Sequence, residues 1–145
     1  MNLKKINNKE IIQALPHKYP FLMVDELLYM DATKTIAKLI INEDNIFARN
    51  GYLQEPGIIE HVAQTTALRP TLEAAEKQYN APLGYFAAIK NFKLYALPPI
   101  NSFIETTAEN VVVIKTAIKV STRSTCNGLL ICESEMLFYL NQSEK

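Results

Sequence analysis

The stretch 56–79 carries apolar residues at the spacing of an amphipathic α-helix. Ile59 and Val62 fall on one face of that helix, and Pro56 suits its first turn. Pro70 removes one backbone hydrogen bond, so we expect a kink there. The pattern predicts one long helix in the middle of the chain.

The other apolar stretches predict β-strands, with a short helix over 8–15 before them and a loop over 44–55 between them. The expected strands are 21–31, 34–43, 83–94, 101–114, 116–124 and 129–140. The dipeptide Asn127-Gly128 is typical of a two-residue hairpin turn. That turn would pair position 126 with 129 and 123 with 132, so Cys126 and Cys132 would not face each other.

The order of these elements predicts an α+β fold. The last four strands follow one another with short breaks, which favours an antiparallel meander in which each strand pairs with the next. The long helix needs a sheet face to cover its apolar stripe. With 145 residues and no internal linker, residues 1–145 are expected to form a single domain.

Composition excludes several function classes. The 15 basic and 15 acidic residues give zero net charge, so no nucleic acid or membrane partner is expected. No apolar run approaches a membrane span, and the start of the chain lacks a signal peptide, so we expect a cytoplasmic protein with reduced cysteines. Two cysteines and two histidines lack zinc-ligand spacing, so no metal site is expected.

Glu60 and Gln64 form the first candidate site, because residues four apart stack on one helix face. The amide could bind the carboxylate and fix its rotamer, and apolar neighbours would partly remove Glu60 from water. We expect the N–H of Gly57 to be unpaired at the helix start, where it could polarise a thioester carbonyl. The alternative is a first-turn glutamate that only stabilises the helix dipole.

The two histidines, His17 and His61, are expected to have different roles. Pro16 and Pro20 hold the segment around His17 extended, so its imidazole could act as an acid, a base or a carbonyl donor. The alternative is a histidine that shapes a loop by bonding to backbone. His61 points about 100° away from Glu60 around the helix, which favours a packing or surface role.

Three motifs in order resemble one enzyme family. LPHKYPFLMVDELL, PGIIEHVAQ and YFAAIKNFKL are similar to signatures of the hotdog-fold (3R)-hydroxyacyl-acyl-carrier-protein dehydratases of fatty acid synthesis. The resemblance implies a single hotdog domain, in which a long central helix is wrapped by an antiparallel sheet. By matching position it implies that Glu60 is catalytic, Gln64 orients it and Gly57 binds the thioester carbonyl.

The resemblance also implies how substrate and partners are handled. Pro16, Tyr85 and Phe86 match positions that line an acyl tunnel, although Tyr85 and Phe86 could equally be core residues. Acyl carrier protein or coenzyme A would present the substrate as a thioester, and no cofactor is implied because the chemistry is proton transfer. Related hotdog proteins form dimers with shared sites, so a homodimer or larger assembly is expected.

One motif of the family is missing. The stretch IFARNGYLQEPG, residues 46–57, stands where the family has a catalytic histidine in a His-Phe-Pro-Gly segment. Depending on alignment, Ile46, Ala48 or Arg49 occupies that slot, and arginine stays protonated near neutral pH. The loss resembles a divergent branch found in aryl-polyene and related pigment pathways. It leaves His17 as the candidate second catalytic residue, with its imidazole expected to face the cavity of Glu60.

Three functions remain open at this point. The first is dehydration of a 3-hydroxyacyl thioester to a trans-2-enoyl product, with Glu60 as the acid/base residue. The second is a hotdog thioesterase, in which Glu60 would activate water. The third is a non-catalytic acyl-binding subunit, which the missing motif histidine favours. A role for Arg49 or Asn50 as a replacement carbonyl donor is also open.

Overall fold

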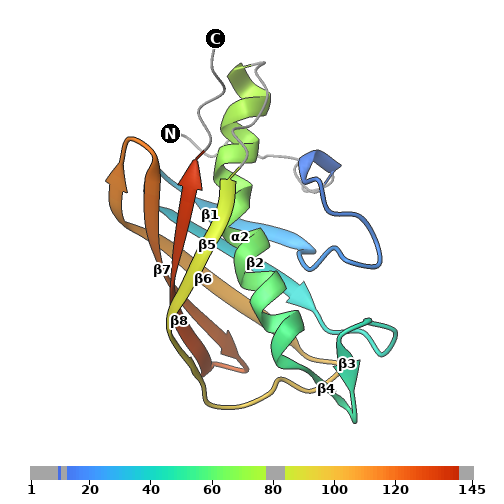
Figure 1. Cartoon of the computed structure of the whole chain (residues 1–145). Helices are drawn as coiled ribbons and strands as arrows, with labels where there is room; N and C mark the ends of the chain where they lie inside the picture. Colours follow the sequence, from blue (N-terminus) through green and yellow to red (C-terminus); the bar gives the residue numbers. More distant parts are fainter. Residues whose placement is uncertain (1–9, 11–12, 78–83, 141–145) are drawn as a thin grey trace.

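A computed structural model describes residues 10, 13–77 and 84–140, with the side chains of 73–87 and 140 outside the described set. Its main feature is a sheet of six strands in the order β1-β2-β6-β7-β8-β5, all paired antiparallel (Figure 1). The strands are β1 (Glu26–Met30), β2 (Lys34–Ile40), β5 (Gly84–Leu94), β6 (Phe103–Ile114), β7 (Ala117–Cys126) and β8 (Leu129–Leu140). The predicted antiparallel sheet and α+β class are confirmed.

The long helix α2 (Glu55–Lys77) lies along one face of this sheet (Figure 1). It runs through Pro70 as one continuous helix, and the kink expected there stays a prediction. Its buried residues Ile58 and Val62 join a core cluster with residues of β2, β6, β7 and β8, while Leu68 and Leu72 join a second cluster. The helix therefore covers the inner face of the sheet, as the apolar stripe requires.

The predicted strand connectivity is wrong in one respect. The expected strands 83–94 and 101–114 follow each other in the chain, but β5 pairs with β8 and not with β6. Of the last four strands that the structure describes, β6, β7 and β8 form a meander and β5 does not join it through β6. β5 is an edge strand of the sheet and pairs with β8, while β6 lies near the middle. The connection between β5 and β6 therefore runs from that edge of the sheet to its middle.

The hairpin at Asn127-Gly128 forms as expected. Both residues have positive φ, 53° and 78°, and Cys126 lies opposite Leu129. The expected pairing of 123 with 132 is wrong by one residue, because a register shift after Ser124 places Ser124 opposite Cys132. Both cysteines are free and buried, and burial raises the pKa of the Cys132 thiol to about 11.

The segment before the sheet differs from the prediction. The expected strand 21–31 begins only at Glu26, since side chains of α2 hold the backbone of residues 21–23. The expected strand 34–43 ends at Ile40. Of the predicted helix 8–15, residues 10, 13 and 14 are helical and the others lie outside the described residues or are not helical.

The predicted loop 44–55 contains a small hairpin. Strands β3 (Ala48–Arg49) and β4 (Tyr52–Leu53) pair antiparallel around Asn50-Gly51, whose φ values are 54° and 83°. This is the same turn chemistry as at 127–128. The Asn-Gly dipeptide at 50–51 is the same hairpin signal in the sequence, although the flanking strands are only two residues long.

The two faces of the six-stranded sheet carry different side chains. On the inner face, buried hydroxyls pair across strands, as in Thr122 with Ser134 at 2.6 Å. The face turned away from α2, here called the charged outer face, alternates in sign from strand to strand. Its basic members are Lys34, Lys38, Lys90, Lys93, Lys119 and Arg123, and its acidic members are Glu26, Glu105, Glu109, Glu133 and Glu135.

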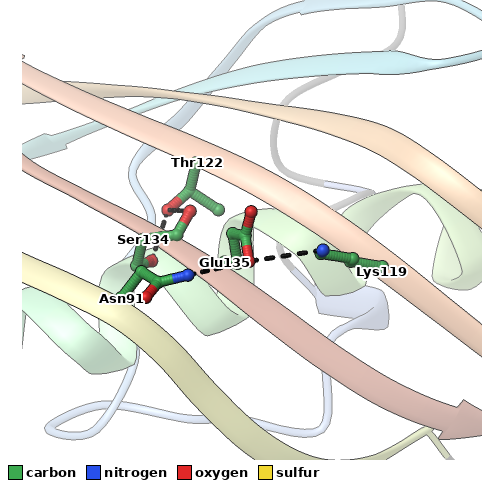
Figure 2. A network of polar contacts seen from close by, with 5 residues as sticks. All are labelled: Asn91, Lys119, Thr122, Ser134 and Glu135. Carbon is green, nitrogen blue, oxygen red and sulfur yellow. Dashed lines mark hydrogen bonds and ion pairs between the residues drawn. The ribbon is translucent and has the colours of Figure 1, made fainter.

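Glu135 illustrates the charged outer face (Figure 2). Its carboxylate lies 3.4 Å from the ammonium of Lys119 on β7 and accepts a hydrogen bond of 3.2 Å from Asn91 on β5. Its chain neighbour Ser134 bonds to Thr122 instead. Opposite charges therefore face each other across the strands, which favours one register.

In the described part of the chain, no helix has the length and apolar character needed to cross a membrane.

Candidate active site

Glu60 and Gln64 meet on α2 as the helical spacing predicts. Gln64 Nε2 donates a hydrogen bond of 3.2 Å to Glu60 Oε2. Gln64 is buried, with 1% of its surface exposed, whereas Glu60 is partly exposed. The pair thus joins a buried amide to a carboxylate that water or substrate can reach.

Gln64 also binds the backbone of the segment before β1. Its Oε1 accepts a hydrogen bond of 2.7 Å from the N–H of Met23, and its Nε2 donates to the carbonyl of Phe21 at 3.0 Å. These contacts distinguish the oxygen of the amide from its nitrogen, because Met23 N can only donate and Phe21 O can only accept. The amide is therefore held in one orientation beside Glu60.

His61 holds the other backbone group of Met23. Its Nδ1 lies 2.6 Å from the Met23 carbonyl, so Nδ1 carries the proton and donates it. The side chain is fully buried, and this burial lowers its pKa from 6.5 to about 4, although the bond to Met23 acts in the opposite direction. A packing role was one of the two predicted for His61, and a surface role is wrong.

These contacts form one unit, which we call the Met23 clamp. It consists of His61, Gln64 and the backbone of residues 21–23. Sequence reasoning placed Gln64 beside Glu60 but did not connect either helix residue with Met23. The partners are 38 and 41 residues apart in the chain, and no local pattern reports such a contact.

Gly57 differs from expectation. Its N–H donates to the carbonyl of Gln54 at 3.0 Å, so the prediction of an unpaired N–H is wrong. The Gln54 carbonyl closes the first turn of the helix and also accepts from Ile58 at 3.2 Å. A Cβ at position 57 would lie 2.6 Å from the Cβ of Phe47 and 2.7 Å from Cδ1 of Leu53, so only glycine fits against the β3–β4 hairpin.

His17 lies just before a turn in which the N–H of Phe21 bonds to the carbonyl of Lys18 at 2.8 Å. Its ring is partly buried, and among the described residues its Nδ1 is covered without a hydrogen-bond partner. Four residues further on, Phe21 reaches Gln64. The orientation of the imidazole towards Glu60 stays a prediction.

The predicted tunnel residues are placed only in part. Pro16 is exposed on the single chain. Tyr85 and Phe86 lie in β5 with their backbones opposite Tyr139 and Phe138, but their side chains lie outside the described residues. Their role in a tunnel stays a prediction.

The slot of the missing histidine falls on the β3–β4 hairpin. Ile46 and Arg49 are exposed and Ala48 is partly buried. The carbonyl of Arg49 accepts a hydrogen bond of 2.8 Å from Gln54 Nε2, and Asn50 forms the turn. No side chain in this slot can exchange a proton near neutral pH as imidazole does.

The cavities described on the single chain lie elsewhere. One, of about 190 Å³, is lined by residues of the charged outer face, including Lys93, Arg123 and Glu133. A smaller one, of about 60 Å³, lies beside Lys90 and Lys119. Glu60 lines neither of them, so the outer-face cavities have no part in the candidate site.

Known proteins are similar to this chain in sequence and in fold. Residues 9–112 match the family model of the ApeP-like dehydratases, described as ApeP dehydratase. The chain belongs to the ApeP-like dehydratase family. The family resemblance inferred from the three motifs, including its divergent branch, is thereby confirmed.

Individual relatives agree with this ApeP-like assignment. The 3-hydroxyacyl-acyl-carrier-protein dehydratase FabZ of Listeria welshimeri is 32% identical over 147 residues, covering 94% of this chain and 97% of its own. The dehydratase heterocomplex ApeI:P of Xenorhabdus doucetiae contains a chain that superposes with a TM-score of 0.81 at 14% identity, covering 92% of this chain and 91% of that chain. Zebra fish thioesterase superfamily member 2 gives a TM-score of 0.72 at 18% identity, covering 92% and 95%. These likenesses confirm the hotdog fold, and both dehydratases and thioesterases share it.

Among the described residues of this ApeP-like chain, no three His, Cys, Asp or Glu side chains gather in a way that could hold a metal ion. The polar groups that do gather are Glu60, Gln64 and His61. Together they can hold a carboxylate in place and leave one of its oxygens for proton transfer. Among these three side chains, Glu60 is the one that is partly exposed and can exchange a proton with a substrate.

Proposed function

We propose that the protein dehydrates 3-hydroxyacyl thioesters to trans-2-enoyl thioesters and water. A base takes the Cα proton, the electron pair of that C–H bond becomes the new double bond, and the C3 hydroxyl leaves with a proton from an acid. The observation that carries the proposal is the Glu60–Gln64 contact of 3.2 Å on the helix that matches the ApeP-like family.

Glu60 is the residue we assign to proton transfer. Gln64 engages Oε2, so we assign Oε1 to the substrate. His17 is the second acid/base candidate. It lies four residues before Phe21, whose carbonyl accepts a hydrogen bond from the Gln64 amide. An imidazole is suited to protonate a leaving hydroxyl near neutral pH.

Gly57 is the candidate donor to the thioester carbonyl, although its N–H is already hydrogen-bonded. Its N–H already donates to Gln54 O at 3.0 Å, so a substrate carbonyl must share or replace that acceptor. The N–H lies in the first turn of α2, where the helix dipole favours an oxygen that gains negative charge. Binding of substrate at Gly57 would then loosen the first turn slightly.

We also propose that a second chain completes the site. Tyr19 and Phe21 are 78% and 59% exposed beside the Met23 clamp, and Phe21 lends its carbonyl to Gln64. An exposed apolar patch beside a functional site is typical of a surface that a partner covers. A homodimer or a pair with a second hotdog chain would cover them and extend the acyl tunnel of Pro16, Tyr85 and Phe86. The heterocomplex of the Xenorhabdus doucetiae neighbour supports the second possibility.

Acyl carrier protein is the proposed carrier, as the name of the FabZ relative supports, with coenzyme A as the simpler alternative. Both carriers present the acyl chain as a thioester. Two free, buried cysteines agree with a reducing compartment, so we propose a cytoplasmic location.

A thioesterase is the second candidate, favoured by hotdog neighbours such as the zebra fish protein. In that reaction Glu60 would activate a water, whose oxygen attacks the thioester carbon, and the thiol would leave. The β3–β4 hairpin lacks the motif histidine of the family, and this absence also fits a non-catalytic acyl-binding subunit. A thioesterase would release a free thiol, whereas a non-catalytic subunit would bind the acyl thioester and form no product.

The test is the Glu60→Gln variant with a 3-hydroxyacyl carrier-protein thioester, in which loss of water is followed by mass. Turnover should fall about 10²- to 10⁴-fold while the fold is kept, because a positioned proton-transfer group is worth that much. Glu55→Gln is the matched control, since Glu55 lies in the first turn of the same helix and is exposed.

Retained turnover in the Glu60→Gln variant would reject Glu60 as the acid/base residue. Equal effects of the two variants on stability, and none on turnover, would support the helix-dipole alternative. Release of free thiol would identify a thioesterase. Turnover that appears only after a second hotdog chain is added would identify a subunit that depends on its partner.

A further inference from the structure

We propose that His61 is a positioning residue, which acts through Met23 and Gln64 to set the orientation of the Glu60 carboxylate. The inference rests on the proposed role of Glu60 and adds a residue to it. Its basis is the set of contacts in the Met23 clamp, each of them between buried or partly buried groups.

Met23 is held at both of its backbone groups from one helix. His61 binds its carbonyl at 2.6 Å and Gln64 binds its N–H at 2.7 Å. Two bonds on opposite sides of one residue fix the rotation of the backbone there. The carbonyl and the N–H of Met23 belong to two successive peptide units that meet at its Cα. Loss of the His61 bond would free the peptide unit that carries the carbonyl, and the resulting shift of the Cα would displace the N–H that Gln64 binds.

Gln64 depends on this segment for its own orientation. A glutamine side chain has three rotatable bonds. Here the oxygen of its amide is bound by Met23 and the nitrogen by Phe21. The bond of 3.2 Å to Glu60 is the longest of its three contacts. The backbone of 21–23 therefore sets the amide, and the amide in turn sets the carboxylate.

Only one of the two ring nitrogens of His61 is hydrogen-bonded among the described residues. Among the described residues, its Nε2 is buried without a hydrogen-bond partner. A buried acceptor left unpaired destabilises the fold. A leucine of similar shape would avoid that cost, so the histidine is explained by the one bond that Nδ1 makes.

His61 does not reach the substrate in this arrangement. Its Nδ1 is engaged by Met23 and the side chain has no exposed surface. It therefore influences the reaction only through the residues that it holds. A shift of about 1 Å in a catalytic group is enough to cost on the order of 100-fold in rate.

The test compares His61→Asn with His61→Leu. Asparagine places an amide nitrogen at the position of Nδ1 and keeps the bond to Met23, whereas leucine has the same branched shape without a donor. We expect kcat to fall about 10- to 100-fold in His61→Leu with little change in KM, and His61→Asn to stay close to the wild type. Thr122→Val serves as the control, because it removes a buried hydroxyl of the distant Thr122–Ser134 pair.

A second readout does not depend on activity. The side-chain amide signals of Gln64 in a ¹⁵N NMR spectrum should shift in His61→Leu, return in His61→Asn and stay unchanged in Thr122→Val. In the wild type, the ring nitrogens of His61 should show the Nδ1–H tautomer, which can be measured even where His61→Leu does not fold.

Three outcomes would overturn the proposal. They are an Nε2–H tautomer in the wild type, an unchanged Gln64 signal and kcat in His61→Leu, and equal damage in the asparagine and leucine variants. If Glu60→Gln keeps full turnover, the proposed function fails by itself. The Gln64 signals would then still decide whether His61 orients the amide.

Discussion

On the charged outer face, ionised side chains meet across neighbouring strands in contact with water, whereas the Met23 clamp uses a few neutral side chains without water. Lys119 and Glu135 lie 3.4 Å apart with 39% and 34% of their side chains exposed. His61 and Gln64 have 0% and 1% exposed, and their bonds to Met23 are 2.6 and 2.7 Å long. More charged residues face each other by register on the outer face, and the dependence on each contact is larger in the clamp.

The difference follows from what replaces a lost partner. Water solvates a charge left alone on the outer face, so an exposed pair is worth about 0–1 kcal/mol. No water replaces a partner lost from the clamp, and each buried group left unpaired costs about 1–3 kcal/mol. The outer face therefore contributes register through many weak pairs, while the clamp contributes position through a few strong ones.

The largest effect is expected for Gln64→Leu. The change leaves the N–H of Met23 and the carbonyl of Phe21 without their partner, which should lower the free energy of unfolding by about 4 kcal/mol. Urea denaturation followed by circular dichroism measures it. A loss below about 1 kcal/mol would mean that the clamp behaves like a surface contact and would end the contrast.

The pH dependence of stability should show the burial of His61. Its pKa falls from 6.5 to about 4 on folding, so below pH 6.5 the unfolded chain takes up a proton that the folded chain does not. Stability is therefore lost as pH falls from 6.5 to about 4, by about 3 kcal/mol in total at 1.36 kcal/mol per pKa unit.

Urea denaturation of wild type and His61→Asn across this pH range isolates that contribution. The asparagine variant lacks the titrating group and keeps every carboxylate, so its stability should fall less steeply. Parallel curves for the two proteins would show that His61 is not buried in its neutral form.

The smallest effect is expected for Glu135→Gln on the charged outer face. It removes the ion pair with Lys119, and the free energy of unfolding should change by less than about 1 kcal/mol, and by still less at high salt. Ser134→Ala is the matched comparison, because Ser134 is the chain neighbour on the inner face and bonds to Thr122 at 2.6 Å. If Glu135→Gln destabilises the protein more than Ser134→Ala, burial does not decide the value of these contacts.

Elements with a local signal could be predicted from the sequence. Periodic apolar residues gave α2 to within a few positions, and Asn127-Gly128 gave the β7–β8 hairpin. The Glu60–Gln64 bond followed from the i, i+4 spacing of a helix. The register shift after Ser124 could not be predicted, because a bulge changes the pairing without a turn residue to mark it.

Contacts between distant segments escaped prediction for a different reason. The pairing of β5 with β8 and the bonds of His61 and Gln64 to Met23 depend on how the helix and the sheet close together. A backbone carbonyl looks alike in every residue, so the sequence does not reveal which side chain will bind it. At Gly57 the helical rule for unpaired N–H groups failed, because a tighter first turn uses the Gln54 carbonyl.

Because Gly57 has no Cβ, the helix start lies so close to Phe47 and Leu53 that no side chain fits between them. Any side chain there would push Phe47 and Leu53 away, and Arg49 and Asn50 would move with them. The position of the hairpin therefore depends on the close approach of the first turn of α2. A loop exchange that introduces a histidine near Glu60 must therefore keep Gly57 and the length of the hairpin. Otherwise the new histidine would lie too far from Glu60.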